Sequence, residues 1–254
     1  MALNLIMLGP PGAGKGTQAE RFARSRGIPK ISTGDILREA VQTGTEVGRR
    51  ARAIMDRGEL VSDDVMIGIV RERLERPDTA GGFVLDGFPR TVAQAEALDG
   101  IISGRDPLIV IDIVVPEAEL VRRLSSRMIC EDCGATAGLE GPAAGADQAV
   151  LSDEGAVGQS RAAQAQAGPL RCRRCGGQLV QRSDDGAEVV RERLKIYGRA
   201  TKPLVEYYRA RPTFRSIDGA QSPDLVAADL AAAIEAAAGA AAGKAAVGRN
   251  GSRS

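Results

Sequence analysis

Phosphate-binding residue types occur near the N-terminus, in the segment Gly9-Pro10-Pro11-Gly12-Ala13-Gly14-Lys15-Gly16-Thr17. An apolar run precedes this segment and a helical pattern follows it, so its glycines can turn successive backbone N–H groups toward a phosphate at the N-terminus of a helix. The Lys15 ammonium would neutralise β- and γ-phosphate oxygens. Gly16 occupies the position where most such loops carry Ser or Thr, and Thr17 follows it. The segment predicts binding of a nucleoside triphosphate rather than a structural turn with an exposed lysine.

The four cysteines form two pairs with the spacing of metal-binding knuckles. Each pair has the pattern C-x-x-C-G, and the pairs are Cys130 with Cys133 and Cys172 with Cys175. Two thiolates of one such turn can bind the same tetrahedral zinc ion, and the second turn completes the four ligands of a structural site. A redox role for each pair is the alternative. Residues 134–171 separate the pairs, and these 38 residues are about twice the spacing expected of a zinc ribbon, so the excess must loop out.

The chemistry of the chain is restricted because it has no histidine. A histidine general base and a catalytic triad built on histidine are therefore excluded. Arginine is suited to phosphate chemistry, since its guanidinium stays charged and pairs with two phosphate oxygens at once. The arginines beside predicted turns or helix starts are Arg38, Arg90, Arg123, Arg127, Arg182, Arg191 and Arg193. Taken singly, each of them could also be a solvated surface charge.

Apolar strands alternate with helical patterns along the chain. The candidate strands are residues 3–8, 82–86, 108–115 and 213–218. The candidate helices are residues 18–26, a helix from Thr33 capped by that residue or by Ser32, and residues 62–76, 117–128, 187–211 and 223–237. This alternation predicts an α/β fold with a parallel sheet. Asp86 ends one of the strands, at the carboxyl edge where open α/β sheets bind ligands.

Composition and charge exclude several classes of protein. The chain has 254 residues, 43% of them hydrophobic and 26% charged, which is typical of a soluble globular protein. Its longest apolar runs of about eight residues are too short to span a bilayer. The 34 Lys plus Arg residues balance 33 Asp plus Glu, and only 3% are aromatic, which weighs against nucleic-acid binding. We expect no membrane or nucleic-acid partner, and a cytoplasmic location because the N-terminus lacks a charged leader.

Two segments have too few large apolar residues to close a core. An Ala/Gly-rich insertion occupies about 138–169, and from residue 238 the chain is mostly Ala, Gly, Lys, Arg and Ser. We therefore expect a flexible surface insertion and a flexible tail at 238–254.

Four motifs resemble those of the adenylate kinase family. They are the string 9–18, Ile31-Ser32-Thr33-Gly34-Asp35-Ile36-Leu37-Arg38, the string 55–63, and Leu85-Asp86-Gly87-Phe88-Pro89-Arg90-Thr91 followed by Gln94. The resemblance runs from Leu3 to Gln221, and it implies the reaction ATP + AMP ⇌ 2 ADP with magnesium, carried out by a monomer. It also implies a P-loop NTPase fold with a five-stranded parallel sheet flanked by helices. The implied parts are a core at 1–31, 62–125 and 186–237, a helical AMP-binding arm at 32–61 and a zinc lid at 126–185.

The resemblance further implies roles for individual residues. The ATP site would comprise Gly12, Ala13, Gly14, Lys15, Gly16, Thr17, Arg127, Thr136, Ala137 and Gln221. The AMP site would comprise Thr33, Arg38, Glu59, Leu60, Val61, Gly87, Phe88, Pro89, Arg90, Gln94, Arg182 and Arg193. The residues implied for catalysis are Lys15, Arg90, Arg123, Arg127, Arg182 and Arg193, and Arg191 would belong to the same cluster. Asp184 and Asp185 would form a hinge pair that contacts arginines. Asp86 would hold magnesium through water. The chain departs from the family at Ala137, where an aromatic residue is expected.

Two other functions remain open from the sequence. A nucleoside monophosphate kinase of the UMP/CMP type would share most of these motifs, and a zinc-knuckle binding protein could use ATP only as a switch. Phosphoryl transfer between two nucleotides needs positive charge around a metaphosphate-like transition state and exclusion of water. Arginines gathered from separate motifs would supply that charge.

Overall fold

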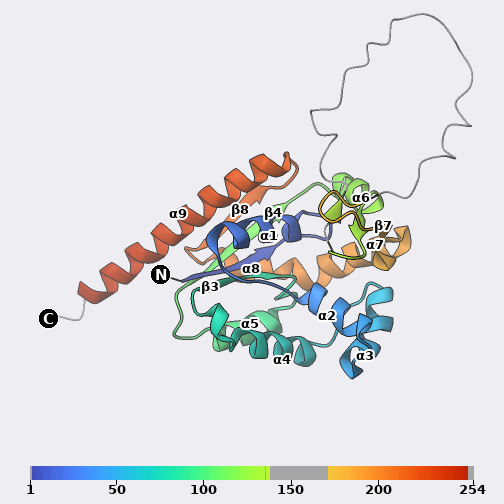
Figure 1. Ribbon diagram of the computed structural model, residues 1–254. Helices are drawn as coiled ribbons and strands as arrows, with labels where there is room; N and C mark the ends of the chain where they lie inside the picture. The colour runs from blue at the N-terminus through green and yellow to red at the C-terminus, as the bar shows by residue number, and fades with distance from the viewer. Residues whose placement is uncertain (1, 135, 138–170, 251–254) are drawn as a thin grey trace, which may run out of the picture. The chain divides into compact units, whose positions relative to one another are not determined.

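The computed structural model describes residues 2–134, 136–137 and 171–250 (Figure 1). The chain divides into two compact units. The larger unit comprises Met1–Ser125 and Ser183–Ser254, and the smaller unit comprises Ser126–Arg182. The smaller unit therefore ends three residues before the predicted lid boundary at 185. Among the described residues, we find no helix with the length and apolar character needed to cross a membrane.

A five-stranded parallel sheet forms the centre of the larger unit, as predicted. Its strands lie in the order β2-β3-β1-β4-β8 and all neighbours run parallel. Their bounds are β1 Leu3–Leu8, β2 Lys30–Ser32, β3 Gly82–Asp86, β4 Leu108–Val114 and β8 Phe214–Asp218. The loops that follow these strands therefore all leave the same edge of the sheet. Strand β2 has only three residues, too few for the alternation of its side chains to have revealed it.

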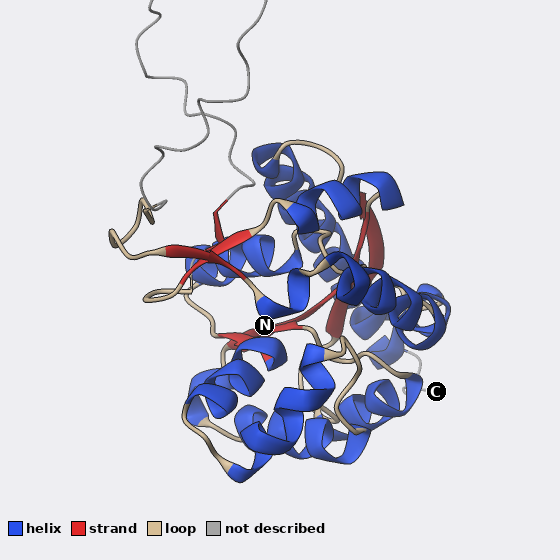
Figure 2. Ribbon diagram, turned by 90° about the vertical axis from the view of Figure 1, so that its right-hand side faces the viewer, coloured by secondary structure: helices blue, strands red, loops and turns tan. Residues whose placement is uncertain are grey.

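Helices cover both faces of this sheet (Figure 2). The α-helices are α1 Lys15–Arg26, α2 Thr33–Gln42, α3 Glu46–Asp56, α4 Asp63–Leu74, α5 Val92–Ile101, α6 Glu117–Ser125, α7 Ala187–Ile196, α8 Pro203–Arg209 and α9 Pro223–Asn250. Short turns are η1 Pro77–Thr79, η2 Ser183–Asp185 and the π-helical η3 Tyr197–Thr201. Helices α2 and α3 occupy residues 33–56, within the predicted AMP-binding arm.

Alternate residues of β1 enter two separate cores. Ile6 and Leu8 pack in one cluster with residues of α4, α5 and α8, whereas Leu5 and Met7 pack in another with residues of α1 and α9. Side chains alternate across a strand with a period of two, so a strand buried on both faces consists of apolar residues throughout. This burial explains the continuous apolar runs that marked β1, β3 and β4 in the sequence.

The structure corrects three of the predicted helix bounds. The helix predicted for 117–128 ends at Ser125 because Met128 enters strand β5. The helix predicted for 187–211 is divided by the π-turn η3 before Pro203, whose missing N–H breaks the regular hydrogen-bond series. The last helix does not end at 237 but continues to Asn250, in keeping with the high helix propensity of its many alanines.

The smaller unit contains a three-stranded antiparallel sheet. Its strands are β5 Met128–Cys130, β6 Thr136–Ala137 and β7 Leu179–Gln181, in the order β6-β5-β7. An isolated bridge between Arg171 and Gln178 precedes β7. The predicted insertion at about 138–169 and the last four residues of the predicted tail lie outside the described residues.

Candidate active site

The glycine-rich loop connects β1 directly to α1 and is shaped by its own lysine. The Lys15 ammonium donates hydrogen bonds to the carbonyl oxygens of Gly9 at 2.7 Å and Pro10 at 2.9 Å. Gly9, Gly12 and Gly14 have φ of 137°, 85° and 91°, which side-chain-bearing residues rarely adopt. Helix α1 begins at Lys15 with no side-chain cap, and the positive end of its dipole lies at the loop, which favours an anion there. The predicted order of strand, glycine-rich loop and helix, with positive φ at the glycines, is confirmed.

Asp86 lies against this loop from the end of the neighbouring strand β3. The register pairs Asp86 with Met7 on one side and with Ser32 on the other. A β-carbon added at Gly16 would lie 3.2 Å from Asp86 Oδ2, so a larger side chain at that position would crowd the carboxylate. Glycine at this position therefore leaves room for an acidic side chain beside the phosphate loop, which suits a hydrated divalent cation.

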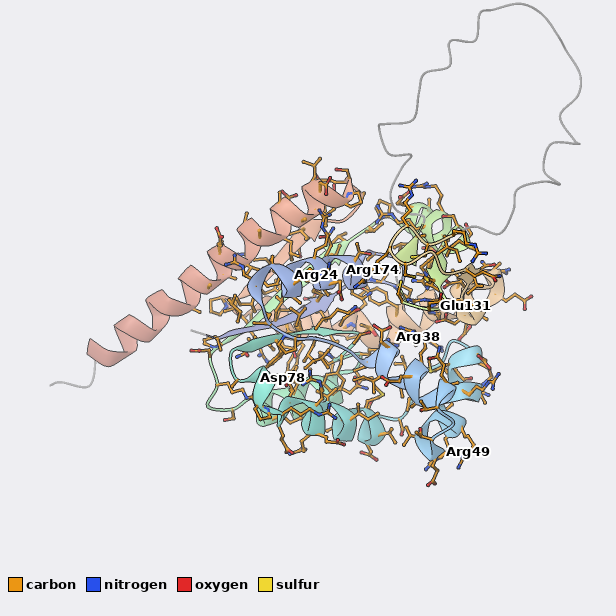
Figure 3. All side chains as sticks on the ribbon, in the orientation of Figure 1. Arg24, Arg38, Arg49, Asp78, Glu131 and Arg174 are labelled. Atoms are coloured by element: carbon orange, nitrogen blue, oxygen red, sulfur yellow. The ribbon has the colours of Figure 1, made fainter. Side chains whose placement is uncertain are left out.

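Three guanidinium groups from separate elements lie near one another in the larger unit. Arg90 lies in the loop after β3, Arg38 on α2 (Figure 3) and Arg193 on α7. Burial, followed by the positive charges of Arg193 and Arg38, lowers the pKa of Arg90 to about 10, although Asp86 and Asp184 oppose this effect. With a pKa of about 10, Arg90 remains charged at neutral pH. Mutually repelling cations held in place by the fold have the charge that suits a polyanionic ligand.

The loop after β3 and the start of α2 hold Arg90 in place. Its Nε donates to the Gly87 carbonyl at 2.8 Å, and the Thr33 hydroxyl donates to the same oxygen at 2.9 Å. Gly87 has φ of 80°, and a β-carbon there would lie 3.0 Å from both Arg90 and Thr33. The sequence left the cap of α2 open between two residues, and the structure assigns it to Ser32, whose Oγ accepts from the Asp35 N–H at 3.2 Å.

Gln94 is buried and hydrogen-bonded through both of its polar atoms. Its side-chain oxygen accepts from the Arg90 backbone N–H at 2.8 Å, and its Nε2 donates to Asp63 at 2.6 Å. The Thr91 hydroxyl donates to the same carboxylate at 2.9 Å. Asp63, which sequence reasoning did not select, thus fixes the orientation of the Gln94 amide, since a carboxylate accepts but does not donate.

The acidic pair at η2, Asp184 and Asp185, contacts Arg193. One guanidinium nitrogen of Arg193 lies 3.0 Å from the Asp184 carboxylate and 3.2 Å from that of Asp185. The Asp185 side chain is fully buried, so this pairing anchors η2 to α7. The predicted contact between the acidic pair and an arginine is confirmed for Arg193.

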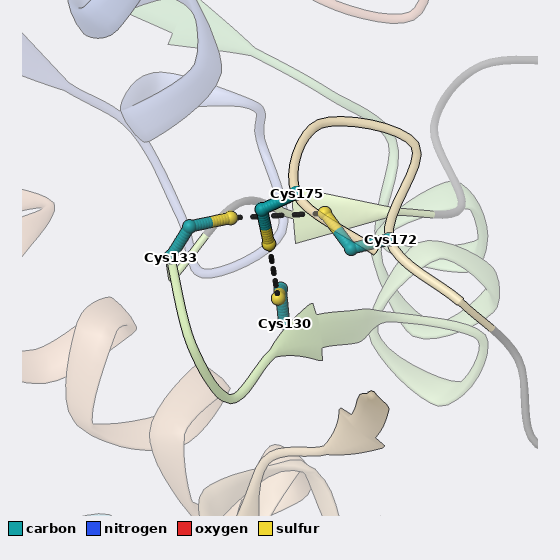
Figure 4. Close-up of side chains that lie close together, drawn as sticks. All are labelled: Cys130, Cys133, Cys172 and Cys175. Atoms are coloured by element: carbon teal, nitrogen blue, oxygen red, sulfur yellow. Dashed lines mark hydrogen bonds between the residues drawn. The ribbon is translucent and has the colours of Figure 1, made fainter. Parts of the chain in front are cut away.

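The four cysteine sulfurs of the smaller unit gather at one point (Figure 4). All four Sγ atoms lie within 4.8 Å of one another, and those of Cys130 and Cys175 are 3.4 Å apart while those of Cys133 and Cys172 are 3.7 Å apart. Zinc–sulfur bonds of about 2.3 Å in a tetrahedron place the sulfurs about 3.8 Å apart, so the cluster fits zinc. The glycine after each pair, Gly134 or Gly176, has positive φ, as the knuckle pattern predicts.

The chain is similar to known proteins over most of its length. A model of the family described as adenylate kinase matches residues 7–213. The chain is 48% identical to an adenylate kinase of Archaeoglobus fulgidus over 221 residues, which covers 86% of this chain and 92% of that protein. It is 47% identical to one of Moorella thermoacetica over 222 residues, covering 87% and 92%, and 44% identical to one of Rhizobium etli over 231 residues, covering 90% and 97%. The chain belongs to the adenylate kinase family.

The remaining residues expected from the family lie in several places. Arg123 donates a hydrogen bond to Glu119 at 2.7 Å. Hydrogen bonds from Arg122 and Arg123 lower the pKa of the Glu119 carboxyl to about 2. Arg191 is exposed on α7. Glu59 accepts two hydrogen bonds from Arg57, at 2.9 and 2.7 Å. Those at intermediate exposure in the larger unit are Gly12, Gly14, Thr17, Leu60, Val61 and Gln221, and those buried are Ala13, Phe88 and Pro89. Those in the smaller unit are Arg127, Thr136, Ala137 and Arg182.

Asp112 is a buried acidic residue that sequence reasoning did not select. It lies on β4, paired in register with Leu8, the residue directly before the glycine-rich loop. Burial raises the pKa of this carboxyl, while the positive charges of Lys15 and then Arg209 oppose the rise. Burial and the Asp112 charge in turn raise the pKa of Tyr197 to about 12. In the sequence, Asp112 could have been recognised as the single acidic residue of an otherwise apolar predicted strand.

We predict that Asp112→Asn stabilises the protein above acidic pH. Because the folded-state pKa exceeds the ordinary value of 3.8, the native state holds a proton in the window just above that value while the unfolded state releases it. The carboxyl therefore reduces stability progressively as pH rises through its folded-state pKa, and an amide does not. Thermal unfolding should show a Tm for the variant that is higher by a few degrees at pH 8, with the difference shrinking toward pH 4. An equal or lower Tm at pH 8 would contradict the assignment.

Proposed function

We propose that the chain transfers the γ-phosphoryl group of ATP reversibly to AMP and so produces two ADP. The observation that carries the proposal is the group of guanidiniums of Arg38, Arg90 and Arg193 in the unit that also contains a phosphate-binding loop. One phosphate loop suffices for a protein that only binds a triphosphate. A second cationic cluster supports an enzyme that binds a second phosphorylated substrate.

The ATP half of the proposed site centres on the loop between β1 and α1. Backbone N–H groups of Gly12, Ala13, Gly14, Gly16 and Thr17 would surround the β-phosphate, and the α1 N-terminus would favour its charge. Lys15 already lies across the loop, bonded to Gly9 and Pro10, so a phosphate would replace carbonyl partners. Magnesium bound with ATP would neutralise further charge, and we propose that Asp86 holds it through water. Gln221, Thr136 and Ala137 complete the proposed contacts to ATP.

The AMP half of the proposed site follows β2 and β3. Arg38 and Arg90 would bind the phosphate of AMP as bidentate partners. Thr33 and Gln94 would define the position of the base, together with the backbone of Glu59, Leu60, Val61, Gly87, Phe88 and Pro89. The network from Asp63 through Gln94 to the Arg90 N–H supports this proposal, since it joins the proposed base-contacting amide to the proposed phosphate-contacting residue.

The proposed chemistry is electrostatic and needs no general base. The transferred group carries its charge on equatorial oxygens, so fixed guanidiniums stabilise the transition state without reorganising. We assign this role to Arg193, Arg123, Arg127 and Arg182, with Lys15 and Arg90 at the two ends of the transfer. The acceptor could also be another nucleoside monophosphate such as UMP or CMP, and the product pattern distinguishes these substrates.

We propose that zinc stabilises the smaller unit and plays no part in the reaction. Four thiolates fill all positions of a tetrahedral ion and leave none for substrate. A sheet of short strands has little core of its own, so metal binding would supply folding free energy. We further propose that the enzyme is a cytoplasmic monomer, a location that the four free cysteines support.

The central test is the product formed from ATP with each monophosphate in turn. We expect ADP formation with AMP at a far higher kcat/KM than with UMP or CMP. Lys15→Ala should lower kcat by at least about 100-fold, because it removes a fixed charge from the transferring phosphates, while the protein still folds. Arg24→Ala, on the exposed side of α1 (Figure 3), is the matched control and should retain full activity.

Three results would count against this function. Faster reaction with UMP or CMP would make the chain a different nucleoside monophosphate kinase. Binding of ATP without ADP formation would favour a binding protein that uses ATP as a switch. Unchanged turnover of Lys15→Ala would contradict the role of that lysine.

Zinc content tests the metal centre independently of activity. We expect the purified protein to contain one zinc per chain by elemental analysis, and Cys175→Ala to lose most of it because three thiolates bind zinc more weakly than four. Arg174→Ala, at an exposed position between two cysteines, is the control and should keep its zinc. Wild-type protein that takes up no zinc, or a Cys175→Ala variant with full zinc content, would refute the site.

A further inference from the structure

Gln18 is a buried amide just beyond the phosphate loop, and the proposed function does not use it. It lies in the first turn of α1, and its side chain is 3% exposed. Its Nε2 donates to the carbonyl oxygen of Pro223, the first residue of α9, at 2.8 Å. The next turn of α1 contributes Arg21, which donates to the same carbonyl at 3.2 Å and pairs with Asp224 at 2.6 Å. One face of the phosphate-loop helix therefore holds the start of α9.

The Gln18 amide is retained at an energetic disadvantage. Its side-chain oxygen is buried and has no hydrogen-bond partner among the described residues. An unpaired buried acceptor costs about 1–3 kcal/mol, and an apolar side chain of similar length would avoid that cost. The need to fill space in the core therefore does not explain why residue 18 is an amide rather than an apolar side chain. The bond from Nε2 to Pro223 is the contribution that an apolar side chain could not make.

The segment that Gln18 holds is the loop between β8 and α9, residues 219–222. The Gly219 N–H donates to the Val114 carbonyl at 2.8 Å, and the Ala220 N–H donates to the Asp218 carboxylate at 2.8 Å. A β-carbon at Gly219 would lie 2.7 Å from Val115 Cγ2, so the loop packs tightly over the end of β4. Strand β4 supports the loop at one end, and Gln18 holds its other end through Pro223.

The strand order places this loop near ATP and away from AMP. Strands β1, β4 and β8 are successive parallel neighbours, so the 219–222 loop leaves the same sheet edge as the phosphate loop, on the β8 side. The residues proposed for AMP follow β2 and β3, on the opposite side of β1. A nucleoside whose phosphates occupy the phosphate loop can therefore extend toward residues 219–222 without meeting the AMP half.

We propose that Gln18 is a positioning residue for ATP: its bond to Pro223 holds the 219–222 loop, which carries the proposed ATP contact Gln221, in place for the nucleoside end of ATP. The proposal rests on the proposed function for that contact and for the identity of the triphosphate, and it adds the anchoring of the loop by Gln18. Loosening the loop should weaken binding of the nucleoside but leave the phosphate loop intact. The expected loss of affinity therefore concerns ATP and not AMP, and it concerns the nucleoside of ATP rather than its phosphates.

The test compares Gln18→Met, which keeps the side-chain length but removes the donor, with wild type. We expect KM for ATP to rise about 5- to 10-fold, the loss of roughly one buried hydrogen bond, while KM for AMP and kcat stay within twofold. Calorimetry should show a matching loss of ATP affinity, whereas inorganic tripolyphosphate should bind both proteins equally. Arg24→Ala, on an exposed part of the same helix, is the control and should match wild type throughout.

Several outcomes would overturn the proposal. An unchanged KM for ATP, an equal rise in KM for AMP, or an equal loss of tripolyphosphate affinity would each reduce Gln18 to a structural residue. Should Gln18→Met fail to fold, Arg21→Ala weakens the same anchor from the surface, and it should raise KM for ATP alone by a smaller factor. The calorimetric arm requires no phosphoryl transfer, so a protein that binds ATP as described but makes no ADP would refute the proposed function and leave the role of Gln18 standing.

Discussion

Repulsion between like charges is the constraint on which the proposed site depends. Arg90 faces Arg193 and Arg38, and these charges together with burial lower its pKa. The fold maintains this arrangement with the Gly87 carbonyl at Arg90, Asp35 at Arg38 and the η2 carboxylates at Arg193. A polyanion bound between the guanidiniums would recover the free energy of holding them together, which is why the proposed site needs a fold that fixes them in advance.

The parallel sheet explains how residues distant in sequence reach this place. The phosphate loop follows β1, Thr33 follows β2 and Arg90 follows β3, and the 219–222 loop follows β8, all at one edge. The strand order then places the proposed AMP residues on one side of β1 and the 219–222 loop on the other. In the described part of the smaller unit, the four cysteine sulfurs gather at one point.

The sequence predicted those features that depend on local spacing. The phosphate loop, the two cysteine knuckles and the apolar strands β1, β3 and β4 were each visible because a few consecutive residues determine them. The roles of Asp112, Asp63 and Gln18 were not visible, since each depends on a partner more than 25 residues away. The end of α9 was also missed: alanines that seemed too small to anchor a tail still favour a helix strongly.

A crystal structure with a bisubstrate analogue, in which two adenosines are joined through five phosphates, tests the central claim most directly. We expect phosphate oxygens within hydrogen-bond distance of the Lys15 ammonium and of the guanidiniums of Arg38, Arg90 and Arg193, with one adenosine near residues 219–222. Density for the analogue elsewhere, with these guanidiniums directed into bulk solvent, would contradict it.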